Sequence, residues 1–549
     1  MKIESLFQKN ETPTINEYLR RCGVVDVENY LNPPASFVEP YENYDNIEKG
    51  VEVLEGAIYE ANIHDKMILL ICDSDCDGYC ATTIAYKFLL SEGVSSTNIE
   101  ALFHGGKQHG LSKEMMEQIN CYISDDNDQE VGLIWLPDAG TNDIDACAYL
   151  YNVMDIPILV TDHHEANEDN IYATIINNQE SRGVKNKQLC GAGVTHKLIT
   201  AFCKKHNSKL HQSCLDLVAL ATIGDVMDMR YNENRMIVKW GLEHIANPTL
   251  RAMCHEFISN ADITPTTLAW NVIPKINAVC RSDNKSLKTQ LFDMLALGDV
   301  LSNSVNDFIN KIKEQHAKQR NETNKLYEEV LSNGYIGDRI KIFKSPNTPY
   351  TGLVATKLSD KYQCPCIVVH GDKFLSGSVR SPIPIRSQLL GCEGVAFCAG
   401  HEQSCGIGWS AENTDELSTF CRQLNLEEPT IHVMYATDNV FMPPEIFDMN
   451  DAGKMLWGHG IPEPTVYFSN ITISGEDIKE LGAGKTTIKF LYGDIEFIMF
   501  FCSKEKKDLL KVGTGGIINI DIIGKPSVNE FRGKKTKQIV IEEFEIKIV

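Results

Sequence analysis

Three short apolar runs between residues 60 and 230 are each followed directly by acidic or histidine residues. These runs are Met67–Cys72, Leu133–Leu136 and Ile156–Val160, and helical patterns separate them. Such alternation predicts a parallel β-sheet with crossover helices. Because open parallel sheets bind ligands at the carboxyl ends of their strands, we expect the polar residues to converge on one edge of the sheet.

The first of these strand ends carries three carboxylates at alternate positions, Asp73, Asp75 and Asp77. An EF-hand calcium loop is excluded, because its twelfth position is Ile84 rather than glutamate and because a strand, not a helix, precedes it. A solvated acidic turn is the plain alternative for this motif taken alone.

The later strand ends add further ligand types to the same edge. They carry Asp138, Asp162, His163 and His164, and Asp225 follows another apolar run. Like charges packed closely repel unless a cation or a proton neutralises them, so the set predicts a metal site. Carboxylate and imidazole ligands favour manganese or magnesium over zinc, and two such ions would suit phosphoester hydrolysis.

Beyond this region the chain changes character twice. No glycine or proline lies between Gly298 and Gly334, which predicts a helix on the order of 50 Å long that connects two lobes. A second α/β segment follows, and beyond Asn425 short strands suggest a small closed or half-closed β domain. We therefore expect an N-terminal segment and four further units: 1–45, 46–298, 299–334, 335–425 and 426–549.

Charge and cysteine usage restrict the partners and the compartment. The net charge of −23 requires that any polyanion be met by bound cations or by a local basic surface. Such a surface is expected near the C-terminus, from Lys525, Phe531, Arg532, Lys534, Lys535 and Lys537. The 18 cysteines form no C-x-x-C pair, and no apolar run is long enough for a membrane span, so we expect a cytoplasmic protein without a membrane anchor.

Several motifs, in order along the chain, resemble those of the DHH phosphoesterases. These are Asp73–Gly78, Asp138–Gly140, Asp162–His164 and Gly224–Asp225. The resemblance narrows to the RecJ-like single-strand exonucleases, because further segments along nearly the whole chain are similar to that family. They are Cys190–Val194, Pro274–Ala278 with Arg281, Ser376–Ser381, Ala399–His401, Trp457–Pro464 and Asn529–Lys534.

The resemblance implies a fold and a set of site residues. The fold is an α/β two-lobe DHH/DHHA1 phosphoesterase, with parallel-sheet lobes joined by the long helix and a C-terminal OB-like β domain. The implied metal ligands are Asp73, Asp75, Asp77, Asp138, His163, His164 and Asp225, of which Asp75, Asp138, His163 and His164 are catalytic. Asp162 would orient an imidazole, and Arg281, Ser378, Arg380 and His401 would bind substrate phosphates.

Three positions depart from the family pattern. His104 stands where an arginine is expected, so we expect one terminal-phosphate contact to be weakened or moved. Cys280 and Ala399 each replace a glycine, and neither change removes a ligand. These departures bear on the preferred substrate end more than on catalysis.

By this resemblance, the chain is a metal-dependent exonuclease of single-stranded DNA. It would act processively from 5′ to 3′ with two divalent cations, Mn²⁺ or Mg²⁺, in recombination, repair or replication, beside a single-strand-binding protein or a helicase. One alternative is a hydrolase of short oligonucleotides, cyclic dinucleotides or pyrophosphate, which would not need the separate β domain. Another is an inactive single-strand-binding scaffold, which would not need mutually repelling carboxylates.

Overall fold

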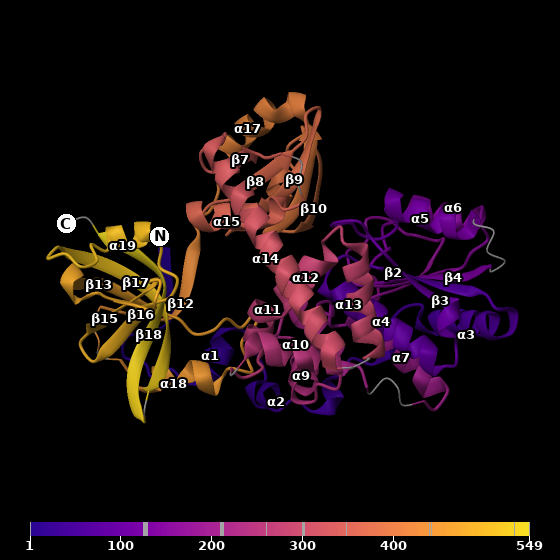
Figure 1. The fold of residues 1–549 in the computed structure, drawn as a ribbon, viewed down its shortest axis with the longest axis horizontal. Helices are drawn as coiled ribbons and strands as arrows, with labels where there is room; N and C mark the ends of the chain where they lie inside the picture. The colour runs from indigo at the N-terminus through magenta and orange to yellow at the C-terminus, as the bar shows by residue number, and fades with distance from the viewer. Residues whose placement is uncertain are drawn as a thin grey trace.

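Three β-sheets, each with its own helices, make up the computed structural model (Figure 1). The structure describes residues 2–124, 130–208, 213–259, 261–298, 302–346, 349–438, 440, 442–531 and 533–547. Within these ranges, none of the helices combines the length and the apolar character that crossing a membrane requires.

The first sheet is parallel throughout and has the strand order β3-β2-β4-β5-β6. Its strands are β2 (Met67–Cys72), β3 (Ile99–Phe103), β4 (Val131–Pro137), β5 (Ile158–Asp162) and β6 (Thr174–Asn177). Strands β2 and β5 are buried along their whole length, which explains their continuous apolar sequence. The predicted parallel sheet is confirmed, with β3 and β6 as additional edge strands.

Helices cover both faces of this sheet. One face packs against α3 (Ile47–His64), α4 (Cys76–Ser91) and α7 (Gly191–Lys205). The other face packs against α5 (Lys113–Ser124) and α6 (Ile144–Asn152). This double cover leaves the carboxyl edge of the sheet to the loops that carry the acidic motifs.

Helices continue the first lobe and lead to the long connector. They are α8 (Leu215–Gly224), α9 (Asn232–Glu243), α10 (Pro248–Ile258), α11 (Pro265–Asn271), α12 (Ile273–Cys280) and α13 (Lys285–Leu297). The predicted long helix is confirmed as α14 (Ser302–Ser332). Phe308 and Ile312 of α14 pack in the core of the first lobe, whereas Leu326 and Val330 pack with the second. One helix therefore anchors both lobes.

The second lobe contains a mixed sheet with the order β10-β11-β9-β8-β7. Its elements are β7 (Lys341–Lys344), α15 (Thr351–Tyr362), β8 (Cys366–His370), β9 (Phe374–Arg380), α16 (Arg386–Leu389), β10 (Val395–His401), β11 (Ser404–Ser410) and α17 (Thr414–Gln423). Among the described strands of this sheet, only β7 and β8 pair in parallel, so the expectation that both lobes contain parallel sheets is wrong for this lobe. Connections as short as Glu402–Gln403 can join only antiparallel neighbours, since a parallel pair needs a crossover of a dozen residues or more.

The third sheet has eight strands in the order β1-β12-β13-β17-β18-β16-β15-β14. Its elements are β1 (Lys2–Phe7), β12 (Thr430–Thr437), α18 (Glu445–Ala452), β13 (Val466–Ser474), β14 (Lys479–Leu481), β15 (Thr487–Tyr492), β16 (Ile495–Met499), α19 (Lys504–Leu509), β17 (Ile517–Phe531) and β18 (Lys534–Lys547). The order runs from β1 to β14 without a pairing between these two strands, so the described sheet is open there.

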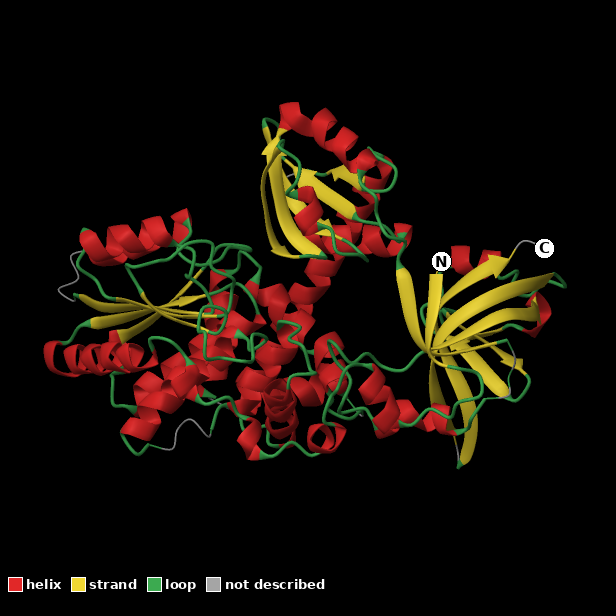
Figure 2. Ribbon diagram, turned by 180° about the vertical axis from the view of Figure 1, so that it is seen from behind, coloured by secondary structure: helices red, strands yellow, loops and turns green. Residues whose placement is uncertain are grey.

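Both ends of the chain belong to this third domain (Figure 2). β1 pairs in parallel with β12, and α1 (Ile15–Arg21) and α2 (Val27–Leu31) pack beside it. Tyr18 meets Trp457 edge to face at 5.9 Å and donates a hydrogen bond to the Pro462 carbonyl at 3.0 Å. The N-terminal segment thus completes the core of the C-terminal domain, an arrangement that the sequence did not indicate.

Candidate metal centre

The acidic motifs converge at the carboxyl edge of the parallel sheet, as the sequence predicted. Asp73 follows β2, Asp138 follows β4 and Asp162 ends β5, and these three strands are neighbours. Asp75 caps the N-terminus of α4 by accepting hydrogen bonds from the Asp77 and Gly78 amides. Asp225 enters from α8, which it caps at the C-terminal end.

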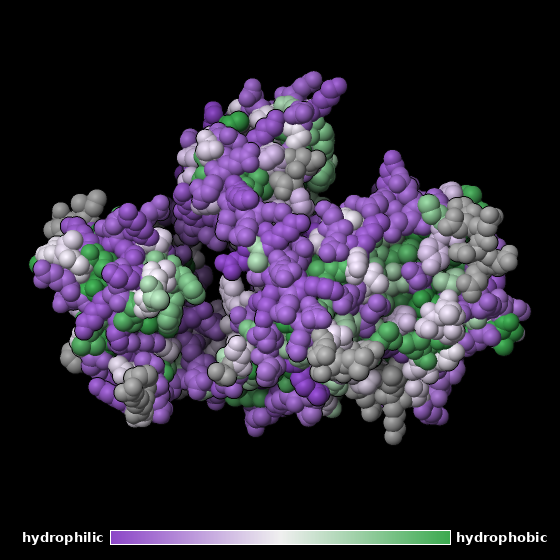
Figure 3. All heavy atoms as spheres, viewed as in Figure 1, coloured by the Kyte–Doolittle hydropathy of each residue, from purple (hydrophilic) through white to green (hydrophobic). Residues whose placement is uncertain are grey.

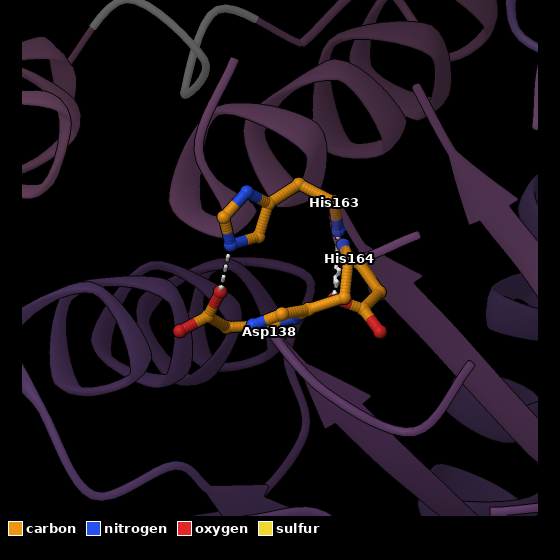
Figure 4. Close-up of side chains that lie close together, drawn as sticks. Asp138, His163 and His164 are labelled. Atoms are coloured by element: carbon orange, nitrogen blue, oxygen red, sulfur yellow. Dashed lines mark hydrogen bonds and ion pairs between the residues drawn. The ribbon is translucent and has the colours of Figure 1, made fainter. Parts of the chain in front are cut away.

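His163 lies close to three carboxylates, and Figure 4 shows its ring directed at that of Asp138. Its Nε2 lies 3.3 Å from Asp138 Oδ1, 3.5 Å from Asp225 Oδ2 and 3.9 Å from Asp77 Oδ2. Burial, together with the charge of His164, lowers the pKa of His163 to about 3, so the ring is neutral at physiological pH. A neutral imidazole is the form that binds metal ions.

Asp162 holds the two histidines in place by hydrogen bonds. Its carboxylate accepts hydrogen bonds from the Thr141 amide at 3.1 Å, the His163 amide at 2.7 Å and His164 Nδ1 at 2.7 Å. Burial alone would raise the pKa of Asp162, but His164 and His163 hold it below its ordinary value. Because Nδ1 of His164 is hydrogen-bonded to Asp162, Nε2 is the ring nitrogen that remains able to bind a metal ion.

Asp77 is held by the start of another helix. It accepts hydrogen bonds from the Gly191 amide at 2.7 Å and the Ala192 amide at 2.8 Å, at the N-terminus of α7. A Cβ at Gly191 would lie 2.1 Å from Asp138 Oδ1, so a side chain there would collide with the cluster. Burial and then the charge of Asp75 raise the pKa of Asp77 to about 6 despite these donors.

The cluster carries more negative charge than its protein neighbours compensate. Asp73 Oδ1, Asp138 Oδ1 and Asp225 Oδ2 are buried and have no hydrogen-bond partner within the described ranges. Burial, followed by repulsion from Asp77 and Asp75, raises the pKa of both Asp138 and Asp225 well above the ordinary range. Buried unpartnered carboxylates of this kind fit divalent cations.

Three groups of side chains place ligand atoms within 4.8 Å of one another. They are Asp138 with Asp162, His163 and His164; Asp77 with His163 and Asp225; and Asp73 with Asp75 and Asp138. Asp138 and His163 each belong to two of these groups, so the three groups are continuous with one another. All seven expected metal ligands therefore lie in one cluster, and the oxygen and imidazole donors suit Mn²⁺ or Mg²⁺.

The loop after β3 adds two residues that the sequence analysis missed. His109 Nδ1 lies 2.6 Å from Asp73 Oδ2, and the pKa of His109 is raised chiefly by Asp73. The surrounding protein removes water from Lys107, and the positive charges of Arg281 and Arg380 lie nearby. Together, in that order, these effects lower the pKa of Lys107 to about 8. Both residues lie in the same loop as His104, whose departure from the family pattern was the available signal.

His104 itself is turned into the protein. It is buried, its Nδ1 lies 3.5 Å from Ser112 Oγ, and its carbonyl accepts a hydrogen bond from Lys288 Nζ at 2.5 Å. Burial lowers the pKa of His104 to about 4, so the ring is uncharged. It therefore offers no cation where the family pattern has arginine, whereas Lys107 on the same loop does.

The residues expected to bind phosphates lie on both lobes. Arg281 caps the C-terminus of α12, with Nη2 3.9 Å from Asp75 Oδ2. Ser378 and Arg380 alternate along β9 beside the N-terminus of α15, where Thr351 Oγ1 lies 3.1 Å from Ser378 Oγ. A helix N-terminus beside a serine and an arginine is a favourable place for an anion.

His401 ends β10 of the second lobe. Its pKa is lowered by burial and by the charge of His164, which belongs to the first lobe. Arg386 also reaches across, with Nη1 4.0 Å from Glu165 Oε2. The surface is hollowed between the upper domain and the domain to its right (Figure 3).

Some of the positive charges in the basic stretch near the C-terminus are paired with acidic side chains. Lys525 Nζ pairs with Glu463 at 2.5 Å and with Glu542 at 2.9 Å, and Lys537 Nζ lies 3.1 Å from Asp494. Lys534 and Lys535 are exposed on β18. Arg532 and the side chain of Phe531 lie outside the described residues. This hairpin therefore offers less free positive charge than the sequence indicated.

Two family models match this chain. The N-terminal domain of the DHH family matches residues 67–222, which hold most of the metal cluster, and the RecJ OB domain matches residues 452–543. The chain therefore carries an N-terminal DHH-family domain and, further along, a RecJ OB domain.

Relatives of this family cover nearly the whole chain. The SPbeta prophage-derived protein YorK of Bacillus subtilis, named as a single-strand DNA-specific exonuclease, is 28% identical over 96% of this chain and 95% of its own length. The single-stranded-DNA-specific exonuclease RecJ of Bacillus subtilis is 26% identical over 99% of this chain and 69% of its own length.

RecJ from Thermus thermophilus in complex with Mn²⁺ shares the fold. It has a TM-score of 0.72 at 18% identity, over 95% of this chain and 74% of its own. The similarity confirms the α/β fold class with a C-terminal OB domain.

The cation-free protein should become less stable as the pH rises from 6.5 to 8.5. Asp138, Asp225 and His164 all have folded-state pKa values raised above their ordinary ones, that of His164 to about 10 because Asp162 outweighs the effect of burial. A raised folded-state pKa contributes stability that is lost as the pH rises through it. We expect the melting temperature to fall by several degrees across this window, as scanning calorimetry would show.

Saturating Mn²⁺ should reverse this trend. Metal ligands must be deprotonated to bind, so the stabilisation by Mn²⁺ should be larger at pH 8.5 than at pH 6.5. The Asp145→Asn variant, changed at an exposed residue of α6, is the matched control and should behave like the original protein. A melting temperature that rises steadily with pH in chelator would contradict the assigned pKa directions.

Proposed function

We propose that this chain is a divalent-metal-dependent exonuclease that hydrolyses the phosphodiester bonds of single-stranded DNA, processively and from 5′ to 3′. The observation that carries the proposal is the cluster of aspartate and histidine side chains in which three buried carboxylate oxygens have no hydrogen-bond partner among the described residues. The names of the relatives support DNA as the substrate. Mn²⁺ and Mg²⁺, the ions bound in the Thermus structures, are the proposed cofactors, and two ions is the proposed number.

The proposed site residues fall into two groups with different roles. Asp73, Asp75, Asp77, Asp138, His163, His164 and Asp225 would hold the cations, whose chemistry is to activate water and to offset charge on the phosphate. Asp162 orients His164 through its Nδ1. Arg281, Ser378, Arg380 and His401 would hold the substrate phosphates, since arginine binds them in bidentate geometry.

The domain organisation is suited to a single strand of DNA that passes between the two lobes. Residues 46–298 and 335–425 form the proposed DHH and DHHA1 domains, and residues 299–334 the connector. Residues 426–549 form the proposed OB-like domain, whose core is completed by β1, α1 and α2 of the N-terminal segment 1–45. Lys534 and Lys535 remain candidates for DNA contacts, together with Lys525, Phe531, Arg532 and Lys537. We place the enzyme in the cytoplasm, in recombination, repair or replication, with a single-strand-binding protein or a helicase as partner.

One incubation tests this function against its alternatives. A 5′-labelled and a 3′-labelled single strand are incubated with Mn²⁺ and separated on a gel. A 5′ to 3′ exonuclease releases the 5′ label at once as mononucleotide, while the 3′-labelled strand shortens from its other end. Intact strands with cleavage of a dinucleotide added to the same incubation would indicate a hydrolase of short substrates, and no cleavage of either would indicate an inactive scaffold.

Removing a phosphate-holding residue should weaken binding more than chemistry. Arg380→Ala and His401→Ala should each raise the KM for a long single strand by about 10-fold, because a hydrogen bond to a charged group contributes roughly 1.5–3 kcal/mol. The rate with a small chromogenic phosphodiester should change by less than about 3-fold, since that substrate needs only the metal lobe. Steady-state kinetics with both substrates measure this difference.

Arg422→Ala, at an exposed position of α17 in the same lobe, is the matched control and should leave both substrates unaffected. If Arg380→Ala and His401→Ala abolish the small-substrate reaction as well, these residues act in catalysis and their assigned role is wrong.

A further inference from the structure

Two thiols meet inside the sheet of the second lobe. Cys398 Sγ on β10 lies 3.3 Å from Cys405 Sγ on β11, and both side chains are buried. The pair lies diagonally across an antiparallel register in which Cys398 faces Ile407 and Gly400 faces Cys405. The two sulfurs are only about 1.3 Å further apart than bonded sulfurs, which lie about 2.0 Å apart.

The thiols are next to the residues proposed to hold phosphates. Ser404 pairs with Arg380 on one side and with His401 on the other, so these three residues form one row across the sheet. Cys405 follows Ser404 directly. Gly400, opposite Cys405, has φ +122°, and a Cβ there would lie 2.9 Å from the Ser404 carbonyl oxygen. A displacement of the Cys405 sulfur would therefore move the backbone of the row formed by Arg380, Ser404 and His401.

The surroundings of Cys398 favour its reaction with an oxidant. β10 is the edge strand of the sheet, and Cys398 keeps 5% of its surface exposed. The hydrogen bond with Cys405 lowers the pKa of Cys398, burial opposes this effect, and Arg386 adds to the lowering. The thiolate is the nucleophilic form of cysteine.

We propose that Cys398 and Cys405 form a reversible disulfide in the presence of a peroxide. We further propose that this bond controls how tightly the second lobe binds its substrate. The Cys398 thiolate attacks one oxygen of hydrogen peroxide, the O–O bond breaks, and the products are Cys398 sulfenic acid and hydroxide. The Cys405 thiol then attacks the sulfenic sulfur, the S–S bond forms, and the sulfenic oxygen leaves as water with the thiol proton. Two molecules of a cellular thiol, which leave as their own disulfide, reduce the bond and restore both cysteines.

The disulfide would hold the β10–β11 hairpin in a different position. Drawing the sulfurs together pulls Cys405 toward Cys398, and the backbone at Gly400 and His401 must follow because it packs tightly against Cys405. His401 and Arg380 would lose their alignment, so the oxidised protein should bind long single strands more weakly. This regulatory part rests on the proposed function, whereas formation of the bond does not.

Digestion by a protease that cleaves after glutamate tests the bond itself. Cleavage after Glu393, Glu402 and Glu412 places Cys398 in the peptide 394–402 and Cys405 in the peptide 403–412. After the full-length protein is treated with hydrogen peroxide and its free thiols are alkylated, mass spectrometry should find these two peptides joined, with two hydrogens fewer than their sum. If they stay separate at peroxide levels that oxidise the exposed Cys121, the proposal is overturned.

Kinetics test the consequence for the substrate. Peroxide should raise the KM for a long single strand by about 10-fold, leave the small phosphodiester within about 3-fold, and be reversed by dithiothreitol. Cys398→Ser and Cys405→Ser should each be insensitive, whereas Cys392→Ser, which keeps the pair, should respond like the original protein. Joined peptides without a change in KM would overturn the regulatory role, and a reduced protein without nuclease activity would refute the proposed function instead.

Discussion

Replacing Asp138 by asparagine should reduce the rate of single-strand hydrolysis by roughly 1,000-fold or more. The Asp138 carboxylate is 3.3 Å from His163 Nε2 and belongs to two of the three groups of ligand atoms, so its loss should affect both proposed ions. Metal-assisted activation of water is worth several kcal/mol, and about 4 kcal/mol corresponds to roughly 1,000-fold in rate.

Asparagine is the suitable replacement because Asp138 has φ +78°, a left-handed conformation that asparagine tolerates better than alanine does. Rates measured over a Mn²⁺ titration, with calorimetry of Mn²⁺ binding, should show lost activity together with weaker binding. Asp145→Asn is the matched control and should retain both.

The same variant should be more stable than the original protein when no cation is present. Asp138 is buried among like charges, so removing its charge removes repulsion from Asp77 and Asp75. A higher melting temperature in chelator would show that the lost activity does not come from a damaged fold. Full activity of Asp138→Asn, or hydrolysis by the original protein in excess chelator, would refute the metal-dependent mechanism.

Separating the third domain from the two lobes should weaken binding of long single strands by at least about 100-fold. The cut has to remove the N-terminal segment as well, because β1 pairs with β12 and Tyr18 packs against Trp457. A fragment of residues 33–425 should therefore fold and cleave short oligonucleotides. A fragment of residues 1–425 exposes the apolar side chains of α1 and α2, each worth about 1.5–3 kcal/mol when buried, and should aggregate.

The expected loss of affinity has two sources. Stacking of a base on an aromatic side chain contributes about 1–3 kcal/mol, and Phe501 is 90% exposed on this domain. Each lost phosphate contact should also flatten the plot of log affinity against log salt by about 0.7. Fluorescence anisotropy with a long oligonucleotide at several salt concentrations measures both effects.

Lys373→Ala in the full-length chain, changed in the second lobe at an exposed residue, provides a comparison that keeps the third domain. Equal affinities and equal salt slopes for the 33–425 fragment and the full-length protein would show that the third domain does not hold DNA.

Local patterns in the sequence were sufficient for the first lobe. Buried parallel strands need continuous apolar runs, and ligands bind where such strands end, so these patterns alone assign Asp73, Asp138 and Asp162 to one edge of the sheet. The long helix was equally visible, because thirty-five residues without glycine or proline leave few alternatives. The order of the motifs, through their family resemblance, indicated the metal ligands.

Long-range pairing was not visible in the same way. β1 and β12 are separated by more than 400 residues, and nothing in either strand's own sequence specifies its partner. The mixed sheet of the second lobe depended on how its short connections turn, which apolar spacing does not report. The acidic partners of Lys525 and Lys537 come from other strands and turns, so the free charge of that hairpin could not be judged from its sequence.

The difference between the features that the sequence predicted and those that it did not has one physical reason. Hydrophobic periodicity and turn residues act over a few positions, so the sequence by itself determined the helices, the parallel sheet and the side chains at its edge. Contacts such as those of His109 with Asp73, Asp77 with the start of α7, and Cys398 with Cys405 depend on which elements pack together. Only the tertiary structure decided these contacts, because the burial free energy that selects them is shared by the whole core rather than held in any one segment.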